Sequence, residues 1–587
     1  HATQVRMGRR ARSTDRRAGS DQGGMKIIRS SLNQDGGVGF SQTMKVQIST
    51  IGGVILCGGF FSSGLSIICA AELTSDGFYK REQVQEIHLT ISKINLDKMK
   101  KALPERKYVP ATLRWRNIRM ENIAVRYKGN SSSQPHQRHK RSYLIKVNEY
   151  NKGTRFLGLR RIALDNGVQF GSLFSEPIVT DILRDLDVPV SRCNYAKLFI
   201  NDDYQGVYVN VERIDESFLE FHFGSKKGPL YKVHMPGPGA NFAYAGDDAQ
   251  QYKKGFEAKT KIAEQSFDDL IDLIRNIDQG DKSNYEQILD KHIMLEHFLK
   301  TTAVMLFAGC FDQLTGWNPH NYYLYRSPKT DRWSYIPWDL DVGFADRAFG
   351  RMPVIDGWHA AWPIPGGPPK PILENIVANP KLLIKYRETA SIILEKYFKQ
   401  KQLHLKIDKL HALIKKDLVN DPYPAKRVTN PQDGGYNDII LSMKKFMVKR
   451  YQLARQQLDN PGPRPKPHYQ DPARHHQHPK PGDLPNGPTE LVVVSRTKNS
   501  IKLQWKDNAK NEAGHIVQRA DKESGGMFRN FIPRPGSSET NAIDVHVIPG
   551  ETYRYRVYTV FPTPNGPAGS KSSKVVVSAP PRKSRGK

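Results

Sequence analysis

Apolar and polar residues alternate in several short runs in the first part of the chain, which predicts β-strands with one buried and one exposed face. The clearest runs are residues 86–91, 123–127, 143–147, 196–200 and 206–212. The last two flank the polar turn Asn201-Asp202-Asp203, an arrangement typical of a β-hairpin. Apolar positions at helical spacing over residues 172–186 predict a helix between the strands.

The pattern becomes mainly helical from Phe267 onward. Residues 288–307 are apolar almost all round, which predicts one buried helix. Helical spacing continues over residues 371–399 and 402–457, and residues 333–336 form a short strand-like run between them and the buried helix. The sequence therefore predicts an α+β domain over residues 86–459, with a β-rich amino-terminal lobe and a helical carboxy-terminal lobe.

A different composition follows this domain. Residues 460–483 are rich in Pro and His, which predicts a linker without a packed core. Residues 484–580 carry short strand-like runs separated by turn residues, which predicts an all-β, immunoglobulin-like sandwich. Trp505 and the alternation of Tyr553, Tyr555 and Val557 resemble a fibronectin type III domain, a module that positions or adheres more often than it catalyses.

The amino terminus carries a pattern typical of secretion. Met44-Lys45 precedes residues 46–71, which contain no charged residue and end in Cys69-Ala70-Ala71, so residues 44–71 are predicted to be a signal peptide. A membrane anchor that is not cleaved is the alternative. Residues 1–43 are predicted to be a disordered or non-native extension, with Met44 as the true start. The predicted location is therefore secreted or in the cell envelope.

Charge and cysteine content narrow the partners. The 587-residue chain has a formal net charge of +30, and 25% of its residues are charged, as in soluble globular proteins. A basic surface attracts anionic polymers, acidic proteins and nucleotide phosphates. The basic residues are dispersed and match no nucleic-acid-binding module, so no specific nucleic-acid partner is predicted.

Cys193 and Cys310 follow the predicted signal peptide, and they form either one disulfide or two buried thiols.

Acidic and amide residues cluster around apolar runs between residues 310 and 344. Asp312 and Asn321 precede such runs, while Asp339 and Asp341 follow one. Phosphoryl transfer uses a carboxylate that orients the acceptor hydroxyl, and Mg²⁺ prefers hard oxygen ligands. The same residue types also cap turns at strand ends, so this pattern alone leaves both interpretations open.

Five short motifs occur in a fixed order along the predicted α+β domain. They are Arg126-Tyr127-Lys128-Gly129-Asn130-Ser131-Ser132, Lys140-Arg141-Ser142-Tyr143-Leu144-Ile145-Lys146, residues 198–208 with Glu212, Asn321-Tyr322-Tyr323-Leu324-Tyr325, and Pro337-Trp338-Asp339-Leu340-Asp341. Together they resemble the signature of the spore coat protein H (CotH) kinase-like family over about residues 86–457.

The resemblance implies an atypical protein-kinase fold that uses ATP and Mg²⁺ (or Mn²⁺). For the nucleotide, it implies a phosphate-facing loop at Gly129, Asn130 and Ser131, a phosphate contact at Lys146, a partner of Lys146 at Glu176, and a nucleotide contact or a brace between the lobes at Glu212. For the chemistry, it implies Asp312 as the catalytic carboxylate and Asp339 as the principal metal ligand, assisted by Asn321 and Asp341.

The implied activity is ATP-dependent phosphorylation of Ser or Thr in surface or extracellular proteins. The basic surface suits an acidic acceptor protein, and the carboxy-terminal module is expected to contact envelope or extracellular proteins or polymers. Because a fold does not determine a reaction, AMP transfer and attachment of an amino acid to a carboxylate remain alternatives. A non-catalytic envelope assembly or adhesion protein is the third interpretation.

Overall fold

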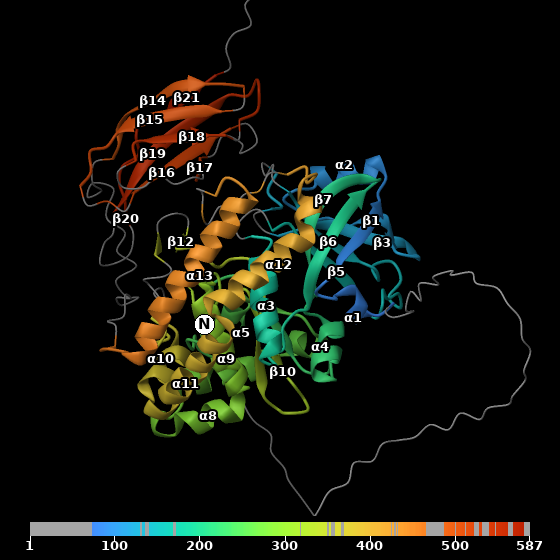
Figure 1. Ribbon diagram of the computed structural model, residues 1–587, viewed down its shortest axis with the longest axis vertical. Coiled ribbons are helices and arrows are strands. Elements are labelled where there is room, and N and C mark those ends of the chain that lie inside the picture. The colour runs from blue at the N-terminus through green and yellow to red at the C-terminus, as the bar shows by residue number, and fades with distance from the viewer. Residues whose placement is uncertain are drawn as a thin grey trace, which may run out of the picture. The chain divides into compact units, whose positions relative to one another are not determined.

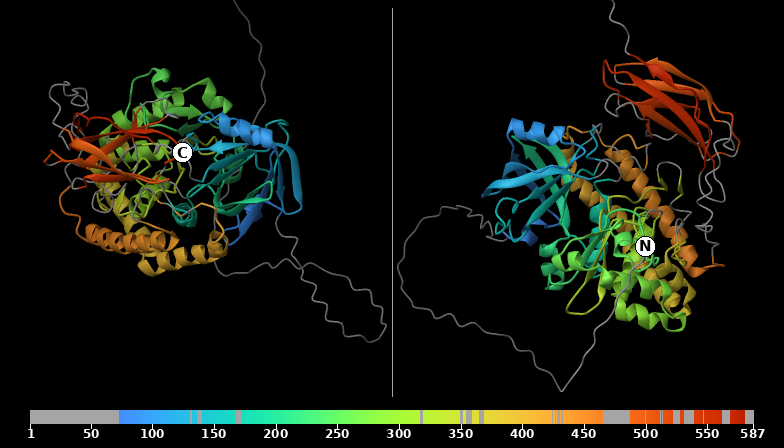
Figure 2. Two further views of the ribbon diagram at one scale, coloured as in Figure 1. Left: turned by 90° about the horizontal axis from the view of Figure 1, so that it is seen from above. Right: turned by 180° about the vertical axis from the view of Figure 1, so that it is seen from behind.

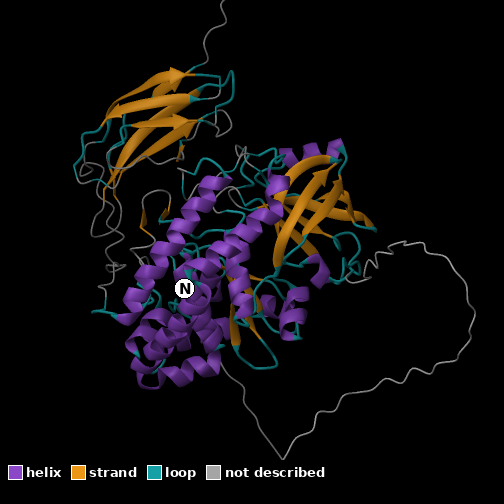
Figure 3. Cartoon of the chain, viewed as in Figure 1, coloured by secondary structure: helices purple, strands orange, loops and turns teal. Residues whose placement is uncertain are grey.

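The chain folds as an α+β protein with 13 α-helices and several β-sheets in the residues that the structure describes (Figures 1 and 3). This computed structural model describes residues 73–129, 132–135, 140–167, 172–316, 319–348, 352–353, 359–364, 369–423, 425, 427, 430, 433–464, 487–498, 500–510, 512, 514–521, 528–530, 539–545, 547–561 and 568–579. The predicted extension, the predicted signal peptide and most of the predicted linker lie outside these residues. Within them, no helix combines the length and the apolar composition that crossing a membrane requires.

The five strands predicted in the first part of the chain, together with β2 and β5, which were not predicted, close into a barrel of order β1-β2-β3-β4-β5-β7-β6. They are β1 (Val84–Thr90), β2 (Val109–Trp115), β3 (Ile118–Lys128), β4 (Ser142–Lys146), β5 (Arg161–Asp165), β6 (Cys193–Ile200) and β7 (Asp203–Val211). The closing pair, β1 with β6, is parallel. Strand β2 buries every second residue (Val109, Ala111, Leu113 and Trp115), so the alternating pattern of the sequence fills the barrel interior.

The predicted hairpin is present as β6 and β7. Its turn residues Asn201 and Asp202 have φ angles of 52° and 67°, a conformation that Asn and Asp tolerate better than most residues. Three helices accompany the barrel: α1 (Ser75–Phe78), α2 (Lys93–Lys101) and α3 (Ser175–Asp185). Helix α3, which the apolar spacing predicted, is buried on nearly all sides and contacts both β6 and α9.

The next part of the chain combines helices with a second sheet. Its elements are α4 (Glu216–Phe223), β8 (Leu230–Val233), α5 (Ala249–Tyr252), β9 (Phe256–Ala258), α6 (Lys261–Gln265), α7 (Asp268–Gln279), the 3₁₀ helix Lys282–Asn284, α8 (Tyr285–His292), α9 (Leu295–Ala308), β10 (Tyr322–Arg326), β11 (Trp333–Pro337), β12 (Arg347–Ala348) and β13 (Met352–Pro353). Four strands form a sheet of order β11-β10-β8-β9. Sequence analysis expected only β11 as a strand here, so most of this sheet was not predicted. Figure 2 shows the barrel strands, blue to teal, grouped apart from the green-to-orange helices.

The prediction of one helix over residues 288–307 is wrong, because α8 and α9 are separate helices. Between them, Ile293 adopts extended backbone angles (φ −126°, ψ 160°) and forms a parallel bridge with Trp333. The next amide, Met294 N–H, donates to the Trp333 carbonyl oxygen at 2.9 Å. Pairing with β11 therefore interrupts a sequence whose apolar residues favour a continuous helix.

The last helices of this region are also more divided than predicted. They are α10 (Pro371–Ala378), α11 (Pro380–Tyr397), α12 (Gln400–Leu418) and α13 (Tyr436–Asp459). The predicted helical stretch 371–399 is split because Pro380 starts α11 and Asn379 caps it, its Oδ1 accepting the Leu382 N–H at 3.1 Å. The predicted stretch 402–457 is split by residues 419–435, which we call the α12–α13 connection.

The carboxy-terminal strands form two sheets that share one hydrophobic core. The strands are β14 (Thr489–Arg496), β15 (Ile501–Lys506), β16 (Gly514–Ala520), β17 (Arg529–Asn530), β18 (Asn541–Asp544), β19 (Tyr553–Phe561), β20 (Ala568–Gly569) and β21 (Val576–Ser578). Leu503 and Trp505 come from the sheet β14-β15-β18, and they pack with Val517, Tyr555 and Val557 of the other sheet. This packing agrees with two facing sheets, while the assignment to fibronectin type III remains a prediction.

Cys193 and Cys310 are both buried, free thiols. The disulfide alternative is therefore not realised in this structure, and the alternative of two buried thiols is. Burial raises the pKa of each thiol, which disfavours the reactive thiolate form.

Candidate functional site

The ends of two barrel strands bring a lysine and a carboxylate together. Lys128 ends β3 and Asp165 ends β5, and β4 runs between these strands. Their side chains form an ion pair. Burial opposes the charge of Lys128, but Asp165 and Asp339 outweigh it and hold the pKa of Lys128 above its ordinary value. Lys128 is thus a buried cation that also lies within the field of Asp339, far along the chain.

The second sheet places Asn321 and Asp339 at the ends of two neighbouring strands. Asn321 immediately precedes β10, Asp339 follows β11 by two residues, and these strands are paired antiparallel. The Asn321 N–H donates to the Val233 carbonyl oxygen at 3.2 Å, and the Asn321 carbonyl oxygen accepts the Trp338 N–H at 2.9 Å. Both Asn321 and Asp339 have positive φ angles, 57° and 63°. Uncommon backbone angles at two neighbouring polar residues are typical of functional sites.

Asp312 lies beside Asn321 in the loop after α9. Its Oδ2 accepts a hydrogen bond from Asn321 Nδ2 at 3.0 Å, and its Oδ1 lies 3.4 Å from His320 Nε2. Burial raises the pKa of Asp312 to about 6; His320 opposes this shift, and the charge of Asp339 reinforces it. The predicted catalytic carboxylate and two predicted metal ligands, Asn321 and Asp339, are therefore neighbours.

Glu176 and Asp341 complete this acidic group. Glu176 stands in the first turn of α3 with 2% of its surface exposed, and its Oε2 is buried without a hydrogen-bond partner. Burial, reinforced by Asp165, Asp339 and Asp341, raises the pKa of Glu176 well above its ordinary value. Burial, reinforced by Asp339, Asp165 and Asp312, raises the pKa of Asp341 well above its ordinary value. The single positive charge of Lys128 does not neutralise these carboxylates, so they repel one another.

Basic side chains border the acidic group. Arg213 and Lys128 flank the Trp338 ring, with Arg213 Cζ at 4.6 Å and Lys128 Nζ at 5.4 Å from its centroid. Burial, reinforced by Arg213, lowers the pKa of Lys232 on β8 to about 7. Burial also lowers the pKa of Lys259, with Arg213 adding to the shift and Glu257 opposing it. Mutually repelling cations beside a group of carboxylates suit an anionic ligand that carries a metal ion.

Two predicted nucleotide residues have other partners. Lys146 forms an ion pair with Glu149, three residues further on, and lies over the Tyr108 ring, so the expected pair with Glu176 is not formed. Glu212 is 1% exposed and binds Arg192 through both oxygens, at 2.5 and 3.0 Å. Its Oε2 also lies 3.4 Å from His222 Nε2. This contact set corresponds to the bracing alternative for Glu212.

The predicted phosphate-facing loop is described only in part, since Asn130 and Ser131 lie outside the described residues. Gly129 has a φ angle of 91°, and a Cβ there would overlap Ser132 Oγ. That hydroxyl donates to the Lys128 carbonyl oxygen at 2.5 Å. Glycine is therefore needed for the tight turn that directly follows Lys128.

A divalent cation fits the acidic group. Carboxylate and amide oxygens are the ligands that Mg²⁺ prefers, and Asp339, Asp341 and Asn321 supply them. Buried oxygens without hydrogen-bond partners, Glu176 Oε2 and Asp165 Oδ2, and the mutual repulsion of the carboxylates both favour added positive charge. Within the described residues, no three His, Cys, Asp or Glu side chains already converge as a ligand set.

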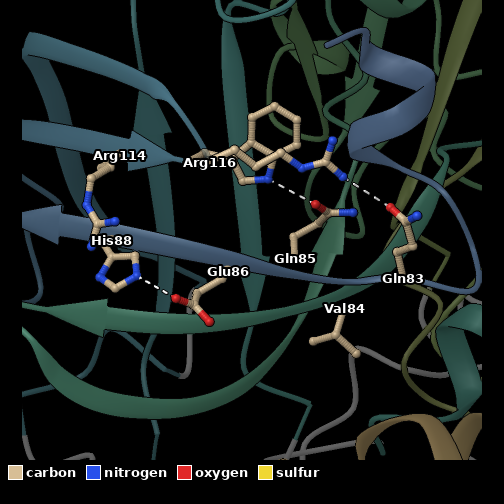
Figure 4. Close-up of a pocket in the computed structure, with 8 residues that line it drawn as sticks. Gln83, Val84, Gln85, Glu86, His88, Arg114 and Arg116 are labelled. Carbon is tan, nitrogen blue, oxygen red and sulfur yellow. Dashed lines mark hydrogen bonds and ion pairs between the residues drawn. The ribbon is translucent and has the colours of Figure 1, made fainter. Parts of the chain in front are cut away.

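A hollow on the barrel involves different residues. It is lined by residues 83–86, His88 and residues 114–116 of β1, β2 and their ends. Figure 4 shows its polar groups paired with one another: Trp115 Nε1 donates to Gln85 Oε1 at 2.9 Å, Arg116 to Gln83 Oε1 at 3.3 Å, and His88 lies 2.9 Å from Glu86. None of the predicted site residues lines it.

Residues 125–454 match the CotH kinase protein family, which is more than half of the chain. The chain belongs to the CotH kinase protein family. The inner spore coat protein H of Bacillus subtilis (strain 168) is 27% identical over 266 residues, which cover 45% of this chain and 69% of that protein. Residues 125–454, which match the family, contain every residue of the acidic group described above.

Three solved structures match a small part of this CotH family chain, each with a TM-score of 0.14. A myokine structure is 18% identical and covers 17% of this chain and 99% of its own. A two-domain fibronectin type III segment of chicken tenascin is 17% identical (16% and 50%), and titin domains A168–A170 are 18% identical (16% and 32%). At this TM-score the likeness decides nothing about the fold.

Sequence reasoning missed four charged residues of the site. Lys128 stands within the first motif, directly before Gly129, so its position was visible but Lys146 was preferred. Arg213 directly follows Glu212, and Asp165 ends a strand that has a short apolar run. No feature of the sequence marks Lys232 as a site residue, because only the pairing of β8 with β10 brings it to the site.

We expect Glu176→Gln to stabilise the metal-free protein. Because its pKa is raised, Glu176 keeps its proton in the folded protein at pH values where the unfolded chain has lost it. The stability of the wild type therefore falls as the pH rises from the pKa of the unfolded chain to that of the folded protein. The variant should therefore exceed the wild type in stability by about 1 kcal/mol or more near neutral pH, and by less near pH 5. Thermal unfolding in EDTA at both pH values measures this, with exposed Glu388→Gln on α11 as control. An equal effect at the two pH values would contradict the assignment.

Glu212→Gln is expected to destabilise the fold without weakening nucleotide binding. Removing the Glu212 charge leaves the buried Arg192 with the exposed Asp76 as its carboxylate partner, and breaking a buried ion pair costs about 3–5 kcal/mol. Urea unfolding measures the loss, and titration with a fluorescent ATP analogue well below the unfolding midpoint measures binding. Exposed Glu220→Gln on α4 is the matched control. A large loss of affinity with unchanged stability would instead assign Glu212 to the nucleotide.

Proposed function

We propose that this CotH family member is an ATP- and Mg²⁺-dependent atypical protein kinase that phosphorylates Ser or Thr of surface or extracellular proteins. The observation that carries the proposal is the convergence of Lys128, from the end of a barrel strand, with Asp339, Asp312 and Asn321, from the second sheet and its loops. A buried lysine facing a carboxylate pair and an amide is the equipment that phosphoryl transfer needs.

The roles follow from position. Lys128, rather than Lys146, is placed to contact the phosphates, and Arg213 and Lys232 supply further positive charge beside it. Asp339, with Asn321 and Asp341, would hold Mg²⁺, which when bound neutralises charge that develops on the phosphate oxygens. Asp312 lies close enough to Asn321 to orient an acceptor hydroxyl at the same place.

The reaction balances with these groups. The acceptor hydroxyl oxygen forms a bond to the γ-phosphorus, the bond from that phosphorus to the β–γ bridging oxygen breaks, and ADP leaves. The hydroxyl proton passes to the Asp312 carboxylate. Burial of Asp312 favours this step, because the raised pKa makes it a stronger base than an exposed aspartate.

Less specific observations support the proposed location and the proposed acceptor protein. The name of the Bacillus subtilis relative, inner spore coat protein H, supports an envelope-associated location for this chain. The net charge of +30 supports an acidic acceptor protein. The signal peptide predicted at residues 44–71 and the binding of envelope or extracellular proteins or polymers by the carboxy-terminal module complete the proposal.

Lys128→Met is expected to lower kcat about 100-fold, because it removes the buried charge next to the phosphates. Lys146→Met is the matched control: both lysines end barrel strands and pair with a carboxylate, but Lys128 also lies in the field of Asp339. Its activity should remain within about threefold of the wild type, as expected for a surface ion pair. Steady-state kinetics with varied ATP measure both variants. The reverse order of effects would return the phosphate contact to Lys146.

Asp339→Asn is expected to lower transfer from γ-labelled ATP by about 100-fold or more, because it removes the principal metal-ligand charge. Asn also tolerates the positive φ angle at this position, so the fold should persist. Asp331→Asn is the control, since Asp331 has a φ angle of 55° but is exposed and paired with Arg326. Protein-bound label is measured with the full chain, Mg²⁺ and a panel of acidic proteins.

The position of the label separates the alternatives. Label from the γ-phosphate supports the kinase, whereas label from the α-phosphate identifies AMP transfer. Incorporation of a labelled amino acid would identify ligation. If the wild type neither binds Mg·ATP nor modifies any protein, the chain is a non-catalytic assembly or adhesion protein.

A further inference from the structure

Two buried charges in the α12–α13 connection contact both halves of the site. Asp421 and Arg427 have side chains that are 1% and 0% exposed. Buried charges are costly unless paired, so their partners show which segments the connection holds in place. The connection begins at the end of α12, which lies beside β7 in Figure 1, where Tyr204 Oη donates to the Asp417 carbonyl oxygen at 3.0 Å.

Asp421 binds the barrel. Its Oδ2 accepts hydrogen bonds from Lys140 Nζ at 2.6 Å and from the Val207 N–H at 2.9 Å. Lys140 Nζ also donates to the Val207 carbonyl oxygen at 2.6 Å, so one lysine joins the connection to β7. Three segments that are distant in the sequence thus meet in one fully buried contact.

This contact explains two motif residues that the proposed chemistry does not use. Lys140 opens the second family-like motif, and Gly206 lies in the hairpin motif. A Cβ on Gly206, whose φ angle is 97°, would overlap the Asp421 carboxylate. The motif lysine supplies the opposite charge, and the motif glycine supplies the space.

The barrel side of this contact leads directly to the site. The Lys140 carbonyl oxygen accepts a hydrogen bond from Asn166 Nδ2 at 2.7 Å. Asn166 follows Asp165, the partner of Lys128, and its N–H donates to Ser142 Oγ at 3.0 Å. Asp421 therefore anchors the segment that carries the Lys128–Asp165 pair.

Arg427 binds the other half. Its Nη2 donates to the carbonyl oxygen of Gly343, two residues after Asp341. Its Nη1 donates to Ser442 Oγ at 3.3 Å and lies 3.5 Å from Asp433 Oδ2. The neighbouring Phe344 N–H donates to the Ala308 carbonyl oxygen at 2.7 Å, so the loop that carries Asp339 and Asp341 is held from two sides.

We infer that Asp421 and Arg427 are positioning residues that hold the Lys128–Asp165 pair and the Asp339–Asp341 loop at a fixed separation. This inference rests on the proposed function, because the separation matters for one nucleotide bound by both halves. Displacing either half by about 1 Å would lower the rate of transfer by 10- to 100-fold, while each half keeps its own contacts to the nucleotide.

The test uses the full chain with Asp421→Asn, Arg427→Met and the conservative Arg427→Lys. We expect kcat to fall about 10- to 100-fold in the first two, with KM for ATP changed less than about threefold, and an intermediate kcat for Arg427→Lys. Asp417→Asn, at the end of the same helix, and half-exposed Arg455→Lys are matched controls expected to resemble the wild type. Unchanged kcat in both Asp421→Asn and Arg427→Met overturns the inference.

A double variant separates positioning from stability. Lys140→Met/Asp421→Leu removes both buried charges, so it should fold even if Asp421→Asn does not. It loses the hydrogen bond to the Val207 N–H, and we therefore expect its thermal stability to recover while its kcat stays low. Recovery of kcat together with stability would make the role structural and overturn the inference.

Hydrogen exchange keeps the inference distinct from the proposed function. If the wild type transfers no phosphate, the proposed function fails, and amide exchange still reports whether the connection holds the two halves. Faster exchange of residues 339–344 in Arg427→Met and of residues 203–208 in Asp421→Asn supports the inference. Unchanged exchange of these segments in both variants overturns it.

Discussion

Electrostatic repulsion among carboxylates that are partly or fully withdrawn from water is the constraint around which this protein is organised. Asp165, Glu176, Asp312 and Asp341 all have raised pKa values, and Asp339 contributes to each shift. A fold does not collect such groups for stability, because each ionised carboxylate costs free energy when it leaves water. Lys128 offsets part of this repulsion and links the barrel to the second sheet. The negative charge that Lys128 does not neutralise would suit a metal ion and a phosphorylated ligand.

Two other buried carboxylates are balanced by cations, and this contrast supports the proposed site. Glu212 is neutralised by Arg192, and Asp421 is neutralised by Lys140, each with additional hydrogen bonds that satisfy the remaining polar atoms. Pairs of this kind hold elements together without offering a place for a ligand. Glu176 and Asp165, in contrast, keep buried oxygens without hydrogen-bond partners. Burial alone therefore does not distinguish the carboxylates of the proposed site, whereas burial combined with unbalanced charge supports it.

Particular residues show how far the sequence carried the prediction. The alternating runs predicted five of the seven barrel strands because burial in a barrel interior depends on a period of two residues, which is local information. The same reasoning failed for residues 288–307, since the backbone bridge between Ile293 and Trp333 is a contact between distant segments. At the site, the family resemblance implied Asp312, Asn321 and Asp339, which the structure brings together, but for the phosphate contact it implied Lys146 and not Lys128. Both lysines pair with a carboxylate, Lys128 with Asp165 and Lys146 with Glu149, but Lys128 also lies in the field of Asp339, and the motifs show none of these contacts.

The sequence by itself indicated the family, five of the seven barrel strands and the acidic and amide residues of the candidate site. These features depend on local spacing and on short motifs, which the linear chain contains in full. Only the tertiary structure decided which lysine faces the carboxylates, why Glu212 is occupied by Arg192, and how Asp421 and Arg427 reach both halves of the site. Those outcomes depend on which charges are buried together, and burial is a property of packing between segments 20 to 281 residues apart.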